Sequence, residues 1–358
     1  MDRAEAPGEM SVDRGRRPAI GTPADRMDRP AAPVGRLPIL ARLRRHRVVS
    51  RALPFLLPAW FALWTIADLS HRFGEFFASD TRIYYRAAQV WLAGGDPWSA
   101  AVGPFNFAGL PPTVQLFAPL TLLPEEVAVW LGFFVAVASA VAIVRMLRLP
   151  MWWLLFPPLA NGVIVANPHI LLTALLISSL PVLEAVASLL KIYAVVPLVG
   201  QFRVRALVIT AVGLIASFAL APNLWFDYIG EMGAITARLN DESAGGFSAA
   251  IAPILLAPMA IIILALALVD RRAASWLAVP ALWPASQFFN STLAMPVLAG
   301  GGAAWFAAML AIPSRGVVPI AIAIYAVVRL WQARGEARVR NQGPAGAVPM
   351  VATDGARG

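Results

Sequence analysis

Long apolar runs separated by arginines constrain this chain more than any other feature of its sequence. One begins at Ala52, the clearest extends from Val127 to Leu147, and others recur as far as Trp331. Several approach the roughly 20 apolar residues that an α-helix needs to cross a bilayer. Only 14% of the residues are charged, whereas soluble domains average about 25%. The sequence therefore predicts an all-α, multi-spanning transmembrane protein with about ten spans.

The two ends of the chain differ from this apolar region. Residues 1–38 and 334–358 are rich in Arg, Pro, Ala and Gly and show no apolar periodicity. Such segments cannot bury enough apolar surface to fold, so we expect a disordered cytoplasmic tail at the start and a disordered basic tail at the end. Residues 39–333 form the predicted membrane domain, and two polar loops interrupt it, at 70–110 and 222–247.

The positions of the arginines predict the orientation of the chain. A cluster from Arg42 to Arg51 precedes the first apolar run, and Arg145 and Arg148 close another. Cytoplasmic loops carry an excess of Arg and Lys, so we expect a cytoplasmic N-terminus in the cell (plasma or inner) membrane, with both polar loops on the outer face. The same arginines explain the net charge of +9, and we expect no nucleic-acid partner.

The first outer loop is the densest group of polar side chains in the apolar region. Its segment from Tyr84 to Leu92 has the spacing of a short amphipathic helix, and Gly94–Pro97 predicts a turn after it. The apolar piece from Pro112 to Pro124 is too short to span, which indicates a broken or re-entrant helix.

Two charged residues in or beside apolar runs have both a chemical and a structural interpretation. Asp80 can act as a general base on a hydroxyl, or it can cap the helix that follows. Lys191, the only lysine of the chain, can hold a phosphate as a point charge. Alternatively, Lys191 pairs with Glu184, which lies two helical turns earlier on the same face.

Other candidates are open to the same two interpretations. His169 is either a satisfied interfacial histidine or a ligand, and with three histidines in the chain no multi-histidine metal site is expected. Asp227 and Tyr228 can help to bind a polar acceptor; alternatively, they cap a helix and belong to an interfacial aromatic belt. Several outer aromatic residues can stack on sugars or form an interfacial belt, namely Tyr84, Tyr85, Trp91 and Trp98.

The order of residues in the first loop has a family likeness. It contains D-x-x-x-Y-Y-x-A-A, then G-G-D-P before an aromatic residue, then P-P, P-L and L-P. The matching residues are Asp80, Tyr84, Tyr85, Ala87, Ala88, Gly94, Gly95, Asp96, Pro97, Trp98, Pro111, Pro112, Pro119, Leu120 and Pro124. This pattern resembles glycosyltransferase family 87, whose members are polyprenyl-phosphate-sugar-dependent membrane enzymes of the GT-C type, including α-1,2-mannosyltransferases. The resemblance extends weakly over about residues 50–330.

The resemblance implies an inverting transfer of a hexose, with mannose as the first candidate, from a polyprenyl phosphate to a lipid-linked or envelope glycan acceptor. Asp80 would be the general base, without a metal or another cofactor. The donor phosphate would contact Lys191, Arg82, Arg86 and His169. The substrate-binding residues would be Tyr84, Tyr85, Asp96, Trp98, Asn167, Asp227, Asn240, Gln287 and Asn290.

Two functions from other classes also fit the pattern. A membrane transporter or flippase of lipid-linked or polar solutes would also have broken helices with polar groups at membrane depth. A non-catalytic partner of envelope enzymes is the third interpretation. The loop of acids and aromatic residues favours the enzyme, because a transporter has little use for it.

Overall fold

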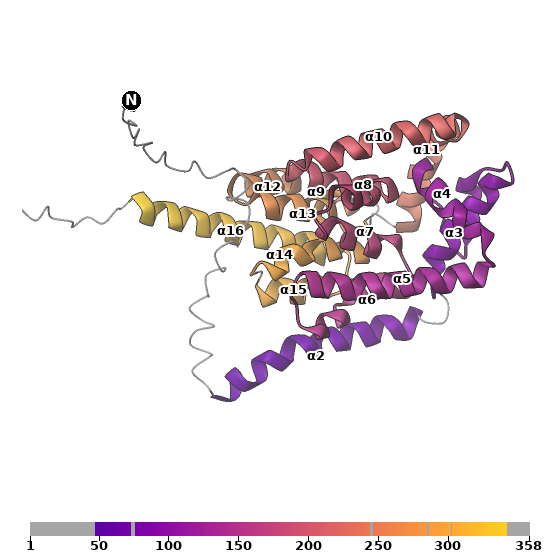
Figure 1. Cartoon of the computed structure of the whole chain (residues 1–358). Helices are drawn as coiled ribbons and strands as arrows, with labels where there is room; N and C mark the ends of the chain where they lie inside the picture. The colour runs from indigo at the N-terminus through magenta and orange to yellow at the C-terminus, as the bar shows by residue number, and fades with distance from the viewer. Residues whose placement is uncertain (1–46, 73–75, 244–245, 285, 302, 342–358) are drawn as a thin grey trace, which may run out of the picture. The chain divides into compact units, whose positions relative to one another are not determined.

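The computed structural model describes residues 47–341, apart from 73–75, 244–245, 285 and 302, and it confirms the all-α class (Figure 1). The α-helices are α2 (Arg47–Arg72), α3 (Ser79–Leu92), α4 (Pro111–Phe117), α5 (Glu125–Met146), α6 (Pro157–Ile164), α7 (Pro168–Ile177), α8 (Pro181–Leu190), α9 (Val195–Gly200), α10 (Val204–Leu220), α11 (Pro222–Ser243), α12 (Leu256–Val269), α13 (Arg271–Leu282), α14 (Met295–Ala299), α15 (Ala304–Leu310) and α16 (Val317–Asn341). Short 3₁₀ helices connect them, namely η2 (Pro97–Ser99), η3 (Ala118–Leu122), η4 (Met151–Leu155), η5 (Ile192–Ala194), η6 (Ala249–Ile251), η7 (Pro253–Leu255) and η8 (Phe288–Ala294).

Few of the described helices are long enough to cross a membrane unbroken. Glu125–Met146 and Val317–Ala337 meet the length and hydropathy of a span, and α10 with α11 makes a third if this pair, bent by 102°, is one span. The expected ten spans are thus not confirmed. Proline is one reason, because it begins α6, α7 and α8. A proline lacks the N–H that would continue a preceding helix and suits the first turn of a new one.

The first polar loop, 70–110, folds much as its sequence predicts. Helix α3 covers the predicted amphipathic segment but begins earlier, at Ser79, and the turn after it places Gly94 at φ 81°. The Pro-bounded piece is broken into α4 and η3, as expected. A two-stranded antiparallel hairpin, β1 (Ala101–Val102) and β2 (Phe105–Asn106), was not predicted. Its turn places Gly103 at φ 56°, where glycine meets no steric cost.

Two polar segments are more helical than expected. The second outer loop, 222–247, is mostly the single helix α11. Helix α16 continues past Arg334, where a disordered tail was predicted, as far as Asn341. Four of the seven residues from Gly335 to Asn341 are Glu, Ala or Arg, which are good helix formers. The predicted tail at 1–38 lies outside the described residues.

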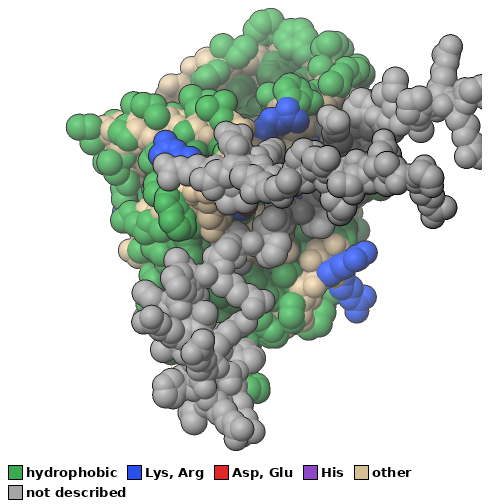
Figure 2. All heavy atoms as spheres, turned by 90° about the vertical axis from the view of Figure 1, so that its left-hand side faces the viewer, with side chains coloured by type: hydrophobic (Ala, Val, Ile, Leu, Met, Phe, Trp, Pro, Cys, Tyr) green, Lys and Arg blue, Asp and Glu red, His purple; other side chains and the backbone are tan. Residues whose placement is uncertain are grey.

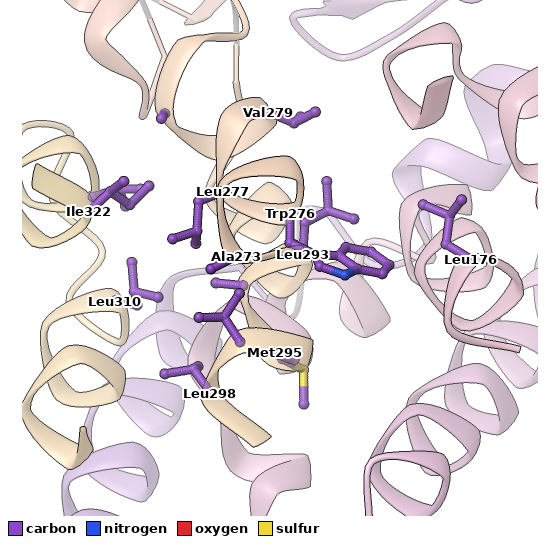
Figure 3. Packing of buried hydrophobic residues seen from close by; sticks show 14 of the residues in the cluster. Leu176, Ala273, Trp276, Leu277, Val279, Leu293, Met295, Leu298, Leu310 and Ile322 are labelled. Carbon is purple, nitrogen blue, oxygen red and sulfur yellow. The ribbon is translucent and has the colours of Figure 1, made fainter. Parts of the chain in front are cut away.

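The larger hydrophobic core is built around α13. Ala273, Trp276 and Leu277 lie at helical spacing on this helix and are buried against side chains of η8, α14, α15 and α16 (Figure 3). Among their neighbours in Figure 3 are Leu293 and Ile322, which are fully buried. This cluster fixes the elements that carry one wall of the site described below.

A second, smaller core belongs to the two polar loops. It joins Tyr84 of α3, Trp98 of η2, Phe107 beside the hairpin and Ile235 of α11. Figure 1 shows α3, α4 and α11 together at one end of the long helices α5 and α10. Figure 2 faces the opposite side, where basic side chains lie among hydrophobic ones on the part of the surface that is described.

Candidate functional site

A cavity of about 690 Å³ is lined by residues of both cores. Its walls come from the start of α3, the hairpin segment, α6 and the break after it, residues 190–193, α11, and residues 283–290. Apolar and aromatic side chains make up much of the lining, and polar side chains, among them Asp80, Asn161 and Asn167, lie between them. A largely apolar cavity with a few convergent polar groups is typical of a ligand site.

The backbone brings Asp80 to this junction. The N–H groups of Ala78 and Asp80 donate to the carbonyls of Ile164 and Val165, at 2.8 and 3.0 Å. The Thr81 hydroxyl donates to the carbonyl of Ala166 at 2.9 Å. The first residues of α3 are thereby fixed against the end of α6, and the Asp80 carboxylate, which is partly exposed, lines the cavity.

Asp80 does not cap its helix. Ala78 occupies the N-cap position, and no side chain caps α3. The capping interpretation of Asp80 is therefore wrong. Its Oδ2 instead accepts a hydrogen bond from Nδ2 of Asn167, and its Oδ1 accepts none from the residues that the structure describes. An aspartate without a capping role, with one oxygen open to a cavity, is available for chemistry.

Asn167 connects Asp80 with Lys191. Its Oδ1 accepts from the Lys191 Nζ at 3.2 Å and from the backbone N–H of His169 at 2.7 Å, so Asn167 caps α7 with the same oxygen. Both of those groups can only donate, which fixes the amide and turns its Nδ2 towards Asp80. A carboxylate and an ammonium thus face one cavity, joined through a single side chain.

The backbone of Lys191 is extended, and this residue separates α8 from η5. Its Nζ stands 5.6 Å from the ring centre of Phe289 and 5.9 Å from those of Tyr84 and Tyr193. Aromatic rings attract a cation at such distances. The alternative pairing of Lys191 with Glu184 is wrong, because the Glu184 carboxylate faces the Nε of Arg203 at 3.7 Å.

His169 lies behind the cavity wall. It is fully buried, with Nδ1 2.6 Å from the Tyr193 hydroxyl and Nε2 2.8 Å from the Thr292 hydroxyl. With both ring nitrogens occupied, His169 cannot contact a donor phosphate directly. The assignment of His169 to the donor phosphate is therefore wrong; the histidine instead orients Tyr193, which does line the cavity.

Burial and charge act on the Asp80 carboxyl in opposite directions. The surrounding protein withdraws it from bulk water, which raises its pKa, while the positive charge of Lys191 and the hydrogen bond from Asn167 lower it in part. The net shift is upward. A carboxylate with a raised pKa is a stronger base than an exposed aspartate.

Besides Asp80 and Lys191, four of the predicted site residues line the cavity, and the rest do not. Tyr84, Asn167, Gln287 and Asn290 line it beside Asp80. Arg82 and Arg86 lie outside and form ion pairs with Glu125 at 2.8 and 3.0 Å. Two of the remaining residues have hydrogen-bond partners within the first loop region: the Tyr85 hydroxyl donates to the carbonyl of Leu123, and the fully buried Trp98 donates to the carbonyl of Gly109. Asp96 is exposed and caps η2, and Asp227 is exposed on α11 and does not line the cavity. The side chain of Asn240 lies outside the described residues.

Sequence reasoning missed several polar residues of the cavity. Asn161 and Tyr193 line it. Tyr228 lines it as well, and it had been considered, together with Asp227, for binding a polar acceptor. Asn161 had a usable signal, since it is a polar residue in the apolar run from Met151 to Val165. Within the described part of the chain, no three His, Asp or Glu side chains are grouped closely enough to hold a metal ion.

No family model, curated protein or solved structure matches this chain. What the site can do is therefore inferred from its own side chains and from the motif of the outer loop.

Proposed function

We propose that this protein is an integral membrane glycosyltransferase of the GT-C type, similar to family 87, which moves a hexose from a polyprenyl phosphate to a lipid-linked or envelope glycan. The observation that carries the proposal is the arrangement of Asp80 and Lys191 on one cavity, joined through Asn167. One group can accept a proton while the other stabilises a developing negative charge. The transfer of a sugar from a phosphate leaving group needs both.

The reaction assigns one role to each group. Asp80 accepts the proton of the acceptor hydroxyl through its open Oδ1, as the hydroxyl oxygen attacks the anomeric carbon. The bond from that carbon to the phosphate oxygen breaks, and the electron pair leaves with the polyprenyl phosphate. Lys191 faces this charge, which an oriented cation stabilises most in the transition state. Attack opposite the leaving group inverts the anomeric configuration.

The shape of the lining supports a substrate with a polar head and an apolar chain. Met232, Ile235 and Leu239 of α11 line the cavity with Phe105 and Phe288. Helix α11 also exposes Phe226 and Ile229 at 61% and 58%. An exposed apolar face of this kind suits contact with lipid.

The proposed setting is a multi-pass protein of the cell membrane with a cytoplasmic N-terminus and about ten crossings, several of them made by broken helices. The cavity would open on the outer face. Ser99 is exposed in the first outer loop, and the chain has no cysteine. Ser99→Cys protein should react with a membrane-impermeant thiol reagent in intact cells. Labelling that requires lysis would place the cavity on the wrong side and contradict the mechanism.

The direct test of function is transfer by the purified protein. In liposomes it should release polyprenyl phosphate from a radiolabelled polyprenyl-phosphate mannose or glucose and form a glycoside of inverted configuration. Comparison of the lipid-linked glycans of cells with and without the gene would identify the acceptor. Absence of transfer from every polyprenyl-phosphate hexose, with membrane extracts supplied as acceptor, would reject the proposal.

The bent pair α10–α11 and the breaks around α7 and α8 favour a transporter or flippase as the second candidate. A transporter would move its solute without forming a new glycosidic bond. Solute movement in the same liposomes, with no glycoside produced, would select it.

A further inference from the structure

Asn161 of α6, like Asn167, lines the cavity and is hydrogen-bonded to an aspartate. Its side chain is 4% exposed and lines the cavity. Its Nδ2 donates to Oδ2 of Asp68, near the end of α2, at 2.6 Å. The outer-loop motif contains neither residue, and the reaction described above uses neither.

The carboxylate of Asp68 determines which way the Asn161 amide faces. A carboxylate only accepts hydrogen bonds, so the NH₂ group must face Asp68 and the carbonyl oxygen must face away from it. Oδ1 of Asn161 accepts no hydrogen bond from the described residues, and it is not among their buried unpaired atoms. It is therefore an open acceptor on the wall of the cavity.

The two asparagines differ in what they leave for a ligand. Asn167 uses its Oδ1 twice and its Nδ2 once, within the protein. Asn161 uses only its Nδ2. A polar atom this deeply placed is normally satisfied by a hydrogen bond, so a bound molecule that donates to it gains affinity.

The charges around the cavity restrict which chemical group can donate a hydrogen bond to Asn161. A phosphate oxygen that is ionised cannot donate, and Lys191 disfavours a second cation in the same cavity. A neutral hydroxyl fits both conditions. We infer that Asn161, held by Asp68, binds one hydroxyl group of a sugar ligand and so sets which sugar is accepted. This inference rests on the proposed function and specifies its substrate class: Asn161 is the specificity-determining residue, and Asp68 is a positioning residue.

The test measures binding, so it does not depend on turnover. Octyl mannoside and its monodeoxy analogues would be titrated by calorimetry into the purified protein in lipid nanodiscs. For the wild type, removal of one particular hydroxyl should weaken binding about three- to tenfold, the effect of a single neutral hydrogen bond. Asn161→Leu should weaken the parent glycoside to the same extent and bind that one deoxy analogue as well as the wild type does.

Asp68→Asn tests the positioning role, since an amide also donates and no longer fixes the orientation of Asn161. It should reduce the preference for the same hydroxyl while leaving the other analogues unaffected, which general loss of structure would not do. Asp96→Asn, at an exposed cap outside the cavity, is the matched control and should change nothing.

Two results would overturn the inference, and each has a distinct bearing on the function. If Asn161→Leu keeps the wild-type ranking of the deoxy analogues, Asn161 does not bind the hydroxyl, and the transferase proposal stands unaffected. If the wild type binds octyl mannoside and octyl glucoside no better than a chain-matched polyoxyethylene ether, no sugar hydroxyl is bound. The transfer assay, which needs no free glycoside, then decides the function separately.

Discussion

Replacement of Asp80 by asparagine separates the chemistry of the site from its structure. Oδ2 of Asp80 accepts from Asn167, and the proposed mechanism assigns the proton to Oδ1. In Asp80→Asn the new amide can still accept from Asn167 through its own oxygen. Its other group is then an NH₂, which donates and cannot take a proton. The variant therefore keeps the contact with Asn167 and loses the base.

The expected loss of rate follows from the role of the group. A positioned general base contributes about 10²–10⁴ in rate, which corresponds to about 2.7–5.4 kcal/mol of activation free energy at 1.36 kcal/mol per tenfold. We expect the upper part of this range, because the substituted atom is a donor where an acceptor is needed. Stability should not fall, because folding raises the pKa of Asp80 and so disfavours its ionised form.

The assay is transfer from a polyprenyl-phosphate sugar by purified variant protein, together with donor affinity and the melting temperature. Donor affinity should stay within about twofold of the wild type, since the base acts on the acceptor. Asp96→Asn is the matched control, because Asp96 caps η2 at an exposed position. Turnover of Asp80→Asn within about tenfold of the wild type would refute the assignment of Asp80 as the base.

The remaining predictions concern charge at and beside the cavity. Lys191→Met should weaken donor binding and turnover together, and Lys191→Arg should restore only part, because a planar guanidinium cannot replace a compact ammonium between three rings; full activity of Lys191→Met would contradict its role. The acid limb of kcat/KM should lie above the usual aspartate pKa of 3.8, because Asp80 must be ionised and its pKa is raised. In a residually active Lys191→Met protein this limb should move to still higher pH, since the lost positive charge had lowered that pKa; a shift to lower pH would exclude the assignment. Arg82→Met breaks partly exposed ion pairs with Glu125 and Glu126. This should cost about 0.2–1 kcal/mol of unfolding free energy and leave donor affinity unchanged. A loss of donor affinity equal to that of Lys191→Met would show that Arg82 contacts the phosphate.

The sequence predicted the fold class but not where its helices end. Hydropathy measures how apolar a segment is and hardly changes where a helix breaks within that segment. The run from Ile170 to Val199 contains two helices, an extended lysine and a third helix. Pro168 and Pro181 signal the starts of two of these helices. No local sequence signal predicts the extended backbone of Lys191, because this conformation is favoured by tertiary contacts with Asn167 and the surrounding rings.

The site was predictable where a charged or polar residue stands out against an apolar background. Asp80, Asn167 and Lys191 met that condition, and the structure brings them together. Arg82 met it as well, yet it pairs with Glu125. Spacing along one helix could not reveal a partner on α5. Asn161 met the condition too and was overlooked, but the orientation of its amide depends on Asp68, 93 residues away, and could not have been predicted.

The junction that builds the cavity also satisfies the ends of two broken helices. The first N–H groups of α3 and the last carbonyls of α6 have no partners within their own helices, and they are paired with each other across the junction. Ala78 and Ala166 flank it at φ 51° and 48°, a left-handed conformation that costs a non-glycine residue about 1–2 kcal/mol. Backbone strain of this kind persists where the surrounding structure enforces it, often at functional sites. Here it turns the chain so that Asp80 leaves one side of the junction and Asn167 the other, within hydrogen-bonding reach. An unbroken pair of spanning helices would have satisfied the same backbone groups internally, and it would have left neither side chain facing the cavity.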